Sequence, residues 1–366
     1  MFDPQSYLNL LESVCDVEHS HSAEKLQLAS GNHEQVAHYP IIISCHDTMR
    51  HIQYDWPPGW PRFSRSEIVT DPAKMLISEL TSVYEGALLK DDRAYTIRAD
   101  YGSVIIPSLL GCSYFEQGNE MPWLQHLSSK NDMERILGSG IPDVHLELGS
   151  RVEETEQYFL ATLSPFEKLK QVVHVGCSDT QGPFNLAASI IGSDIFLIVL
   201  DNPDMVHKLL QLVTDTCIAF IKLHKATVNE PIGLSYQMGW AVRGGARIVD
   251  DSAINLSRSM YKEFCLPYNL QISQEFDGFM GHFCGRGTQI FPEILATPGI
   301  HSLNFGNPEM QEWGDVYQQA VDHQVCLLWD DQIPDDNNQI KTGVIQKKLA
   351  HSWDQANQIA AQIKRN

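Results

Sequence analysis

The segment GHFCGRG, Gly281 to Gly287, places a histidine two residues before a cysteine and surrounds both with glycine. Side chains two residues apart on an extended chain point to the same side, so His282 and Cys284 could share one metal ion. Zinc takes three or four nitrogen, sulfur or oxygen ligands in a tetrahedron. A thiol bound to such an ion would lose its proton and become a better nucleophile. The pair alone does not decide between a zinc site and a tight turn without a metal.

Carboxylates end several strand-like runs elsewhere in the chain. Asp100 follows TIRA, Asp179 follows VVHVGCS, and Asp251 ends ARIVDD. Asp100 and Asp251 are predicted catalytic residues that orient or protonate groups of a substrate, and Asp179 is a predicted substrate-binding residue. The alternatives are local, because a carboxylate at a strand end can cap a turn, and Asp179 can form an Asx-turn.

Larger side chains near strand ends complete the predicted substrate site. Tyr236, Trp240 and Trp329 could line a pocket for a flat or apolar ligand, although aromatic residues at such positions often only fill the core. Arg286 lies in the CGRG turn, which could hold an anion where a helix begins.

The elements that must position these residues alternate between strand-like and helix-like segments. Strand-like runs are expected in YPIIISCHD, TIRAD, QVVHVG, ARIVDD, GFMGHFC, IHSLNFG, VCLLWDD and GVIQKKL, with helices between most of them. About eight such runs predict an α/β fold, a (β/α)8 barrel of the TIM type with N-terminal helical and hairpin elaborations. We expect one domain over residues 1–366, in which residues 1–40 form a helical extension. In such barrels the strand ends face one mouth, where these residues should lie together: Asp100, Asp179, Asp251, His282 and Trp329.

The composition restricts the function. The 366 residues include 46 acidic and 26 basic side chains, for a formal net charge of −20. Nucleic-acid-binding proteins present basic faces, so no nucleic-acid partner is expected. No apolar run reaches the about 18 residues of a membrane-spanning helix, and the N-terminus lacks the basic segment of a signal peptide. We therefore expect a cytoplasmic protein with no membrane partner. Its eight cysteines include no CxxC pair and should be reduced, with Cys217 on the apolar face of a helix.

Four stretches resemble segments of one known superfamily. They are RADYGSVIIPSLLG, DTQGPFNLAASIIG, GARIVDDSAINLSRSMYKEFCLPYNLQI and HFCGRGTQIFPEIL, which lie between Arg98 and Leu295. They resemble the uroporphyrinogen decarboxylase superfamily, which holds the decarboxylases and the zinc-dependent methylcobamide:thiol methyltransferases. Asp100 matches, with a slight shift in spacing, an aspartate that is essential in the decarboxylases. The resemblance implies the same barrel fold.

The chain departs from the decarboxylase pattern near its N-terminus. The decarboxylases share an Arg-Gln-Ala-Gly-Arg-Tyr motif whose arginines hold the carboxylates of the porphyrinogen. The corresponding region here reads SCHDTMRHIQYDWPPGW, and Arg50, Arg62 and Arg65 lie nearby but outside that pattern. A substrate rich in carboxylates needs bidentate guanidinium contacts, so uroporphyrinogen is not the expected substrate.

The chain also departs from the methyltransferase pattern, which is His-x-Cys followed by a distant cysteine in the last strand. The last strand-like run, GVIQKKL, contains no cysteine, and Cys326 lies one run earlier, in VCLLWDD. The resemblance thus implies zinc at His282 and Cys284, with Cys326 as third ligand. Asp330, Asp331 or a thiol of the substrate are the alternative third ligands.

The resemblance implies a zinc-dependent methyltransferase that moves a methyl group from a methylated corrinoid to a small-molecule thiol or similar acceptor. A corrinoid-carrying protein is the expected partner, and a homodimer is an assembly that the resemblance allows. Two alternatives stay open. One is a decarboxylase of a tetrapyrrole or a smaller acid, and the other is a ligand-binding barrel without catalytic activity.

Overall fold

The computed structural model describes residues 2–47, 52–53, 55–116, 118–127, 130–334, 340 and 342–363. Its strands are β1 (Ile41–Ser44), β2 (His46–Asp47), β3 (Ile52–Gln53), β4 (Tyr95–Arg98), β5 (Tyr114–Phe115), β6 (Trp123–Leu124), β7 (Val173–Gly176), β8 (Leu234–Gln237), β9 (Trp240–Arg243), β10 (Ala246–Val249), β11 (Phe279–Phe283), β12 (Ile300–Phe305), β13 (Cys326–Trp329) and β14 (Val344–Leu349).

The helices of the first half are α1 (Gln5–Val14), α2 (Val17–Gly31), α3 (Arg65–Thr70), α4 (Pro72–Leu89), α5 (Ile105–Leu109), α6 (Lys130–Ser139), α7 (Glu147–Leu163), α8 (Leu169–Val172) and α9 (Pro183–Ile191). Those of the second half are α10 (Ile195–Asp201), α11 (Pro203–Val228), α12 (Arg258–Phe264), α13 (Leu266–Glu275), α14 (Phe291–Leu295), α15 (Trp313–Asp322) and α16 (Trp353–Ile363), with the 3-10 turns η1 (Ala253–Asn255) and η2 (Pro308–Met310).

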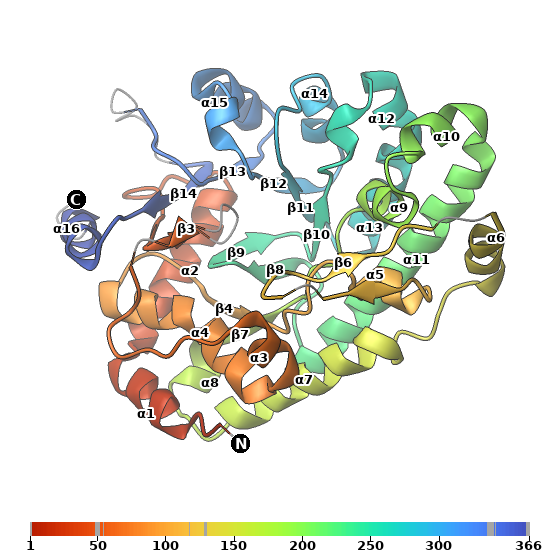
Figure 1. Ribbon diagram of the computed structural model, residues 1–366. Coiled ribbons are helices and arrows are strands. Elements are labelled where there is room, and N and C mark those ends of the chain that lie inside the picture. Colours follow the sequence, from red (N-terminus) through yellow and green to blue (C-terminus); the bar gives the residue numbers. More distant parts are fainter. Residues whose placement is uncertain are drawn as a thin grey trace.

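Eight strands form two parallel ladders that helices surround (Figure 1). The larger ladder has the order β1-β14-β13-β12-β11-β10, and the smaller pairs β4 with β7. All eight runs predicted as strands contribute to these two ladders. In the described part of the chain no backbone ladder joins β4 to β1 or β7 to β10. The architecture is therefore a mixed α/β fold consistent with the TIM type, whose parallel strands and outer helices follow the prediction.

Charged side chains, rather than a ladder, connect β1 to the segment before β4. Asp91 Oδ2 accepts a hydrogen bond from Ile43 N at 2.7 Å, and Asp92 Oδ2 accepts one from Ile41 N at 2.9 Å. Arg93 donates from Nη2 to Ile43 O and to Asp91 Oδ2. These contacts satisfy edge backbone groups of β1 that would otherwise be buried without partners.

The hairpin β8–β9, which the sequence did not predict, packs against the amino-terminal part of the strands. Gly239 in its turn accepts a hydrogen bond from Ala94 N at 2.9 Å, just before β4 begins. Gln27 of α2 donates to Gly239 O at 3.0 Å and accepts from Ala241 N at 2.8 Å. The hairpin places Trp240 and Val242 in an apolar cluster with inward side chains of four strands: Ile42, Met280, Cys326, Leu328 and Ile345. We call this set the interior cluster.

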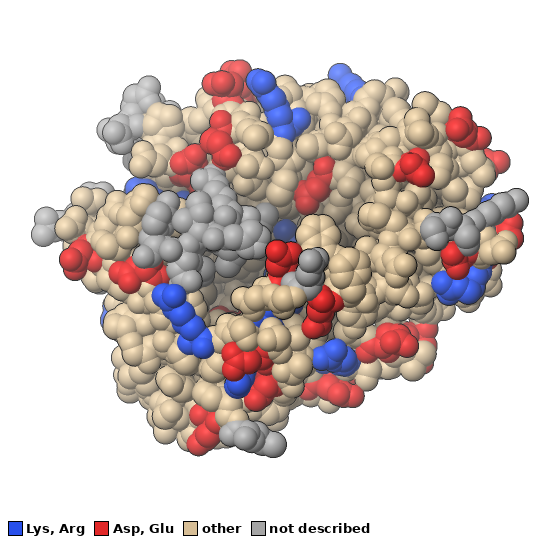
Figure 2. Space-filling model, viewed as in Figure 1, with Lys and Arg blue, Asp and Glu red and all other residues tan. Residues whose placement is uncertain are grey.

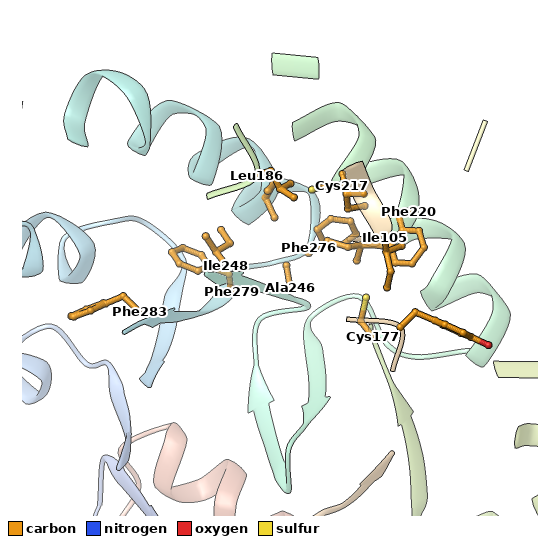
Figure 3. Packing of buried hydrophobic residues seen from close by; sticks show 14 of the residues in the cluster. Ile105, Cys177, Leu186, Cys217, Phe220, Ala246, Ile248, Phe276, Phe279 and Phe283 are labelled. Atoms are coloured by element: carbon orange, nitrogen blue, oxygen red, sulfur yellow. The ribbon is translucent and has the colours of Figure 1, made fainter. Parts of the chain in front are cut away.

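The helices bury their apolar faces against the outside of the strands. Figure 3 shows Cys217 of α11 and Phe220 in this packing, with Cys177 and Ile105 close by. Cys217 is fully buried and all eight cysteines are free, which confirms both expectations about the cysteines. No single described helix has the length and apolar composition needed to cross a membrane, and α9 with α10 meets that criterion only as a pair bent by 103°.

Replacing Arg93 by methionine should lower the free energy of unfolding by about 3–5 kcal/mol, because two buried carboxylates lose their counter-charge. Arg93 is 1% exposed and lies 2.8 Å from Asp91 and 3.2 Å from Glu85. Urea unfolding measures the change. The exposed Arg243, whose Nη1 donates to Asn32, is the control, and its replacement by methionine should cost no more than about 0.5 kcal/mol. Equal losses in the two variants would contradict this role of Arg93.

Candidate functional site

Strands β10, β11 and β12 hold polar residues in register at their carboxyl ends. His282 of β11 pairs with Val249 of β10 and with Asn304 of β12. Because side chains alternate along a strand, Asp251 and Cys284, each two residues further on, follow the side taken by Val249 and His282. Asp251, His282 and Cys284 come together as a group of potential metal ligands, which we call the ligand triad.

The distances in the ligand triad fit a tetrahedral metal ion. His282 Nε2 lies 3.5 Å from Cys284 Sγ and 3.8 Å from Asp251 Oδ1. One ligand atom from each residue lies within 4.8 Å of the other two. A tetrahedral zinc ion with nitrogen at about 2.0 Å and sulfur at about 2.3 Å separates those two atoms by about 3.5 Å. The histidine and cysteine are therefore already spaced for zinc, and three protein ligands leave one position for a substrate.

Asn304 determines which nitrogen of His282 faces the ligand triad. Asn304 Nδ2 donates to Leu328 O at 2.8 Å, so its Oδ1 is the atom that accepts from His282 Nδ1 at 2.7 Å. Nδ1 therefore carries the hydrogen, and Nε2 presents its lone pair toward Cys284. Metal-binding histidines are commonly oriented in this way by a partner on the other ring nitrogen.

Burial controls the charge of both His282 and Cys284. Burial, reinforced by the positive charge of Arg247, lowers the pKa of His282 to about 4, so the imidazole is neutral near pH 7. Burial, reinforced by the carboxylate of Asp251, raises the pKa of the Cys284 thiol to about 12. A metal cation between these groups would reverse the effect on the thiol, because it favours the thiolate.

Two glycines allow the backbone to approach the ligand triad. A Cβ atom at Gly306 would overlap Cys284 Sγ, so a larger residue does not fit beside the thiol. Gly285 has a φ of +81°, which favours glycine, and its N–H donates to Asn307 Oδ1 at 3.0 Å. Cys284 N donates to Asp251 Oδ1 at 2.7 Å. The turn after β11 thus fixes the thiol beside the carboxylate.

Asp251 rather than its neighbour Asp250 belongs to the site. Asp250 Oδ2 accepts from Tyr261 OH at 3.1 Å and from Asn269 Nδ2 at 2.9 Å, which ties the end of β10 to α12 and α13. Burial raises the pKa of Asp250 to about 6. Asp250 therefore has a structural contact on the helix side, which leaves Asp251 as the carboxylate of the ligand triad.

Cys326, the predicted third metal ligand, does not join the ligand triad. It pairs with Ser302, two residues before Asn304 on β12. Two residues along a strand span about 6.6 Å, so Cys326 lies deeper than His282. It is 1% exposed and belongs to the interior cluster. The structure offers Asp251 as the third ligand instead.

The two carboxylates considered as alternative third ligands also lie outside the ligand triad. Asp330 Oδ2 lies 3.5 Å from Asn304 Nδ2, on the far side of Asn304 from His282. Asp331 Oδ1 accepts from Gln332 N at 2.7 Å in the turn after β13. Asp330 is thus closer to the site, as a neighbour of the residue that orients His282.

The three predicted aromatic pocket residues take part in the packing of the fold, and a contact with substrate stays a prediction for them. Trp240 is fully buried in hairpin β8–β9. Tyr236 of the same hairpin stacks on His174, with ring centroids 3.7 Å apart. Trp329 packs edge-on against Trp313 of α15, with centroids 4.8 Å apart. Trp329 therefore does not share the mouth with the other predicted residues.

Asp100 and Asp179 take part in a row of alternating charges. Arg65 Nη1 donates to Asp100 Oδ2 at 2.7 Å, and Arg98 Nη2 lies 3.4 Å from Asp100 Oδ1. Arg247 Nη1 donates to Asp179 Oδ1 at 3.1 Å, and Asp179 also interacts electrostatically with Arg98. We call these five residues the charged row. Figure 2 shows a hollow in the face that it views, with basic side-chain atoms inside and acidic side chains around it.

The charged row contains two functional candidates that sequence reasoning missed, Arg98 and Arg247. Both could have been found from strand alternation, because Arg98 precedes Asp100 by two residues and Arg247 precedes Asp251 by four. Of the other arginines considered, Arg62 lies 4.5 Å from the centre of the Trp56 ring.

Two further arginines stand apart from the charged row. Arg286 is exposed in the turn after β11, where its predicted substrate contact stays a prediction. Arg50 lies outside the described residues.

The fold is shared with a protein of known structure. A methyltransferase from Methanosarcina mazei superposes with a TM-score of 0.62 at 14% identity, over 94% of this chain and 99% of that chain. This likeness establishes the common fold.

Sequence similarity relates part of the chain to uroporphyrinogen decarboxylases. Uroporphyrinogen decarboxylases of Xanthomonas campestris pv. campestris, from strains B100 and 8004, are 27% identical over 212 residues. The match covers 54% of this chain and 53% of those relatives, about half of their length. No family profile matches the chain. The resemblance to the uroporphyrinogen decarboxylase superfamily that the motifs predicted is confirmed.

Replacing Glu79 by glutamine should change how stability depends on pH. Glu79 Oε2 accepts from Arg98 N at 3.0 Å, and burial, followed by the charge of Asp100, raises its pKa to about 7. An acid with a raised folded-state pKa loses stability as pH rises from its unfolded value toward its folded value. Between about pH 4.5 and 7 the melting temperature of the wild type should therefore fall by a few degrees more than that of Glu79→Gln.

The control for this comparison is Glu275→Gln, which changes an exposed pair with Lys222. Its melting curve should follow the wild type across the same pH range. Parallel curves for Glu79→Gln and the wild type would show that Glu79 ionises normally.

Proposed function

We propose that this protein is a zinc-dependent methyltransferase that moves a methyl group from a methylated corrinoid to a thiol. The observation that carries the proposal is the 3.5 Å spacing of His282 Nε2 and Cys284 Sγ beside Asp251, which suits a tetrahedral zinc ion. The fold shared with a methyltransferase supports it, and the curated relatives and the fold neighbour both carry the names of enzymes. The donor would be carried by a partner protein.

The residues of the chain have distinct roles in this proposal. His282, Cys284 and Asp251 would hold zinc, and Asn304 keeps His282 Nε2 aimed at the ion. A bound zinc ion would supply a thiolate at neutral pH by stabilising the deprotonated sulfur of the substrate. Methyl transfer would form a sulfur–carbon bond and break the carbon–cobalt bond of the donor, whose electron pair would stay on cobalt while the thiol proton would leave to solvent.

Decarboxylation is the second candidate, favoured by the similarity to uroporphyrinogen decarboxylases. The pairing of Asp100 within the charged row argues against uroporphyrinogen as the substrate. Asp100 would be the aspartate that contacts the substrate, yet Arg65 and Arg98 already pair with it. The predicted catalytic role of Asp100 is thereby reduced in our proposal to holding the two arginines.

The purified protein should not convert uroporphyrinogen to coproporphyrinogen above the rate of a boiled control. The physical reason is that the chain lacks the N-terminal arginine motif that would bind the many carboxylates of this substrate. In addition, Asp100 is already paired with Arg65 and Arg98. Product analysis by chromatography and fluorescence measures this. Turnover clearly above the control would promote decarboxylation to the leading function.

Zinc content should depend on the ligand triad and not on Cys326. After incubation with excess zinc and desalting, the wild type should retain about one zinc ion, whereas Cys284→Ala and Asp251→Asn should lose it. Loss of a direct ligand should weaken binding by more than the about 10- to 100-fold expected for Asn304→Ala, which removes only the outer partner of His282. Cys326→Ala is the matched control and should keep its zinc.

Activity is tested with methylcobalamin as donor and a simple thiol as acceptor, followed by the loss of the methylcobalamin spectrum. The wild type and Cys326→Ala should be active, and Cys284→Ala inactive. Zinc retained without methyl transfer would favour a ligand-binding barrel. A wild type that retains no zinc would contradict the proposed function.

A further inference from the structure

The charged row carries an excess of positive charge. Its three guanidinium groups, Arg65, Arg98 and Arg247, face two carboxylates, Asp100 and Asp179. The raised pKa of Glu79, next to Arg98, limits how much negative charge that residue adds near pH 7. In a chain with a formal net charge of −20, this row is a local exception. An excess of buried positive charge suggests that an anion completes the row.

Like Arg65, whose buried Nε has no hydrogen-bond partner among the described residues, Arg247 has unused binding capacity. Its side chain is only 8% exposed, and one terminal nitrogen, Nη1, donates to Asp179. Its Nε is buried and has no hydrogen-bond partner among the described residues. A guanidinium presents its N–H groups as a planar fork that matches the two oxygens of a carboxylate. A buried N–H without a partner is costly, so a ligand that accepts from Nε would relieve that cost.

Arg247 also lies at the end of the row next to the ligand triad. It pairs with Met280 on β11, two residues before His282. Strand alternation therefore places the Arg247 side chain on the same side of the strands as His282 and Cys284. Through Asp179 it is coupled to Arg98 on the other side. A ligand held by Arg247 would therefore reach the ligand triad with its other end.

We propose that Arg247, supported by Arg98, binds a carboxylate of the methyl acceptor, so that the acceptor is a small thiol with a carboxylate at its other end. This inference rests on the proposed function for the thiol end of the acceptor. Asp179 holds Arg247 in place and competes with the substrate carboxylate. Arg247 determines specificity by the charge and the planar geometry of its fork.

The first test compares 3-mercaptopropionate with its neutral isostere 3-mercaptopropionamide on the cobalt(II)-loaded protein. Thiol binding is read from the rise in thiolate-to-cobalt absorption. The wild type should prefer the acid by about 10- to 100-fold, the range expected when a charged hydrogen-bonded pair forms. Equal affinity for the two thiols would overturn the proposal while leaving the metal site intact.

The variants separate the role of Arg247 from a general loss of structure. Arg247→Met should remove the preference for the acid and leave the affinity for the amide unchanged. Arg247→Lys keeps the charge without the fork and should restore part of the preference. Asp179→Asn should strengthen binding of the acid, because a competing carboxylate is gone. Arg243→Met, at the exposed end of hairpin β8–β9, is the control and should match the wild type.

A second measurement does not depend on a metal. Saturation-transfer NMR with propionate and propionamide, on protein without added metal, reports the carboxylate contact directly. Propionate should give a saturable signal that Arg247→Met loses, and propionamide should give none. A wild type that binds no metal but shows this signal would refute the proposed function and support the anion site. A propionate signal that survives in Arg247→Met would refute the anion site.

Discussion

The parallel register of β10, β11 and β12 is the constraint on which the candidate site depends. It sets His282 beside Asn304, and strand alternation then carries Asp251 and Cys284 to the same side two residues further on. Hydrogen bonds then fix the orientation of these side chains. Asn304 fixes the ring of His282, and Asp251 accepts from the backbone of Cys284. A shift of one residue between β10 and β11 would turn Asp251 away from the other two ligands.

The inward side chains of the strands form an apolar part toward the amino ends of the strands and a charged part toward their carboxyl ends. Hairpin β8–β9 supplies Trp240 and Val242 to the interior cluster, which leaves no polar partner there for Cys326. Above it, the charged row and the ligand triad concentrate titratable groups at low exposure. Because these groups are little exposed, water screens them weakly, and the electrostatic interactions between them are stronger. Burial also lowers the pKa of His282 and raises that of Cys284, so both side chains are neutral near pH 7.

The sequence predicted the parallel strands well because hydrophobic alternation is a local signal. All eight strand-like runs became strands of the two ladders, and the His282–Cys284 pair faces one side as period-two spacing requires. The third ligand could not be predicted, because it depends on the depth at which neighbouring strands pair. Cys326 pairs with Ser302, below the site, and nothing local to VCLLWDD reveals this register.

Orientation and long-range packing account for the other differences. Asp250 and Asp251 are equivalent in sequence, and only the contacts of Asp250 with Tyr261 and Asn269 on the helix side distinguish them. Tyr236 and Trp240 lie in a hairpin whose apolar, Gly-containing sequence resembles a loop between longer elements. The pattern of the zinc-dependent family predicts a cysteine near the end of the chain as third ligand, so it points to Cys326 and its neighbours Asp330 and Asp331 and not to Asp251.

X-ray absorption at the zinc edge tests the central claim most directly, because it counts the ligand types around the ion. The account predicts, for zinc-loaded wild type without added thiol, one sulfur at about 2.3 Å and nitrogen or oxygen ligands at about 2.0–2.2 Å. Cys284→Ser should remove the sulfur, and Cys326→Ser should leave the spectrum unchanged. Two sulfur ligands in the wild type, one of them lost in Cys326→Ser, would contradict the assignment of Asp251 as the third ligand.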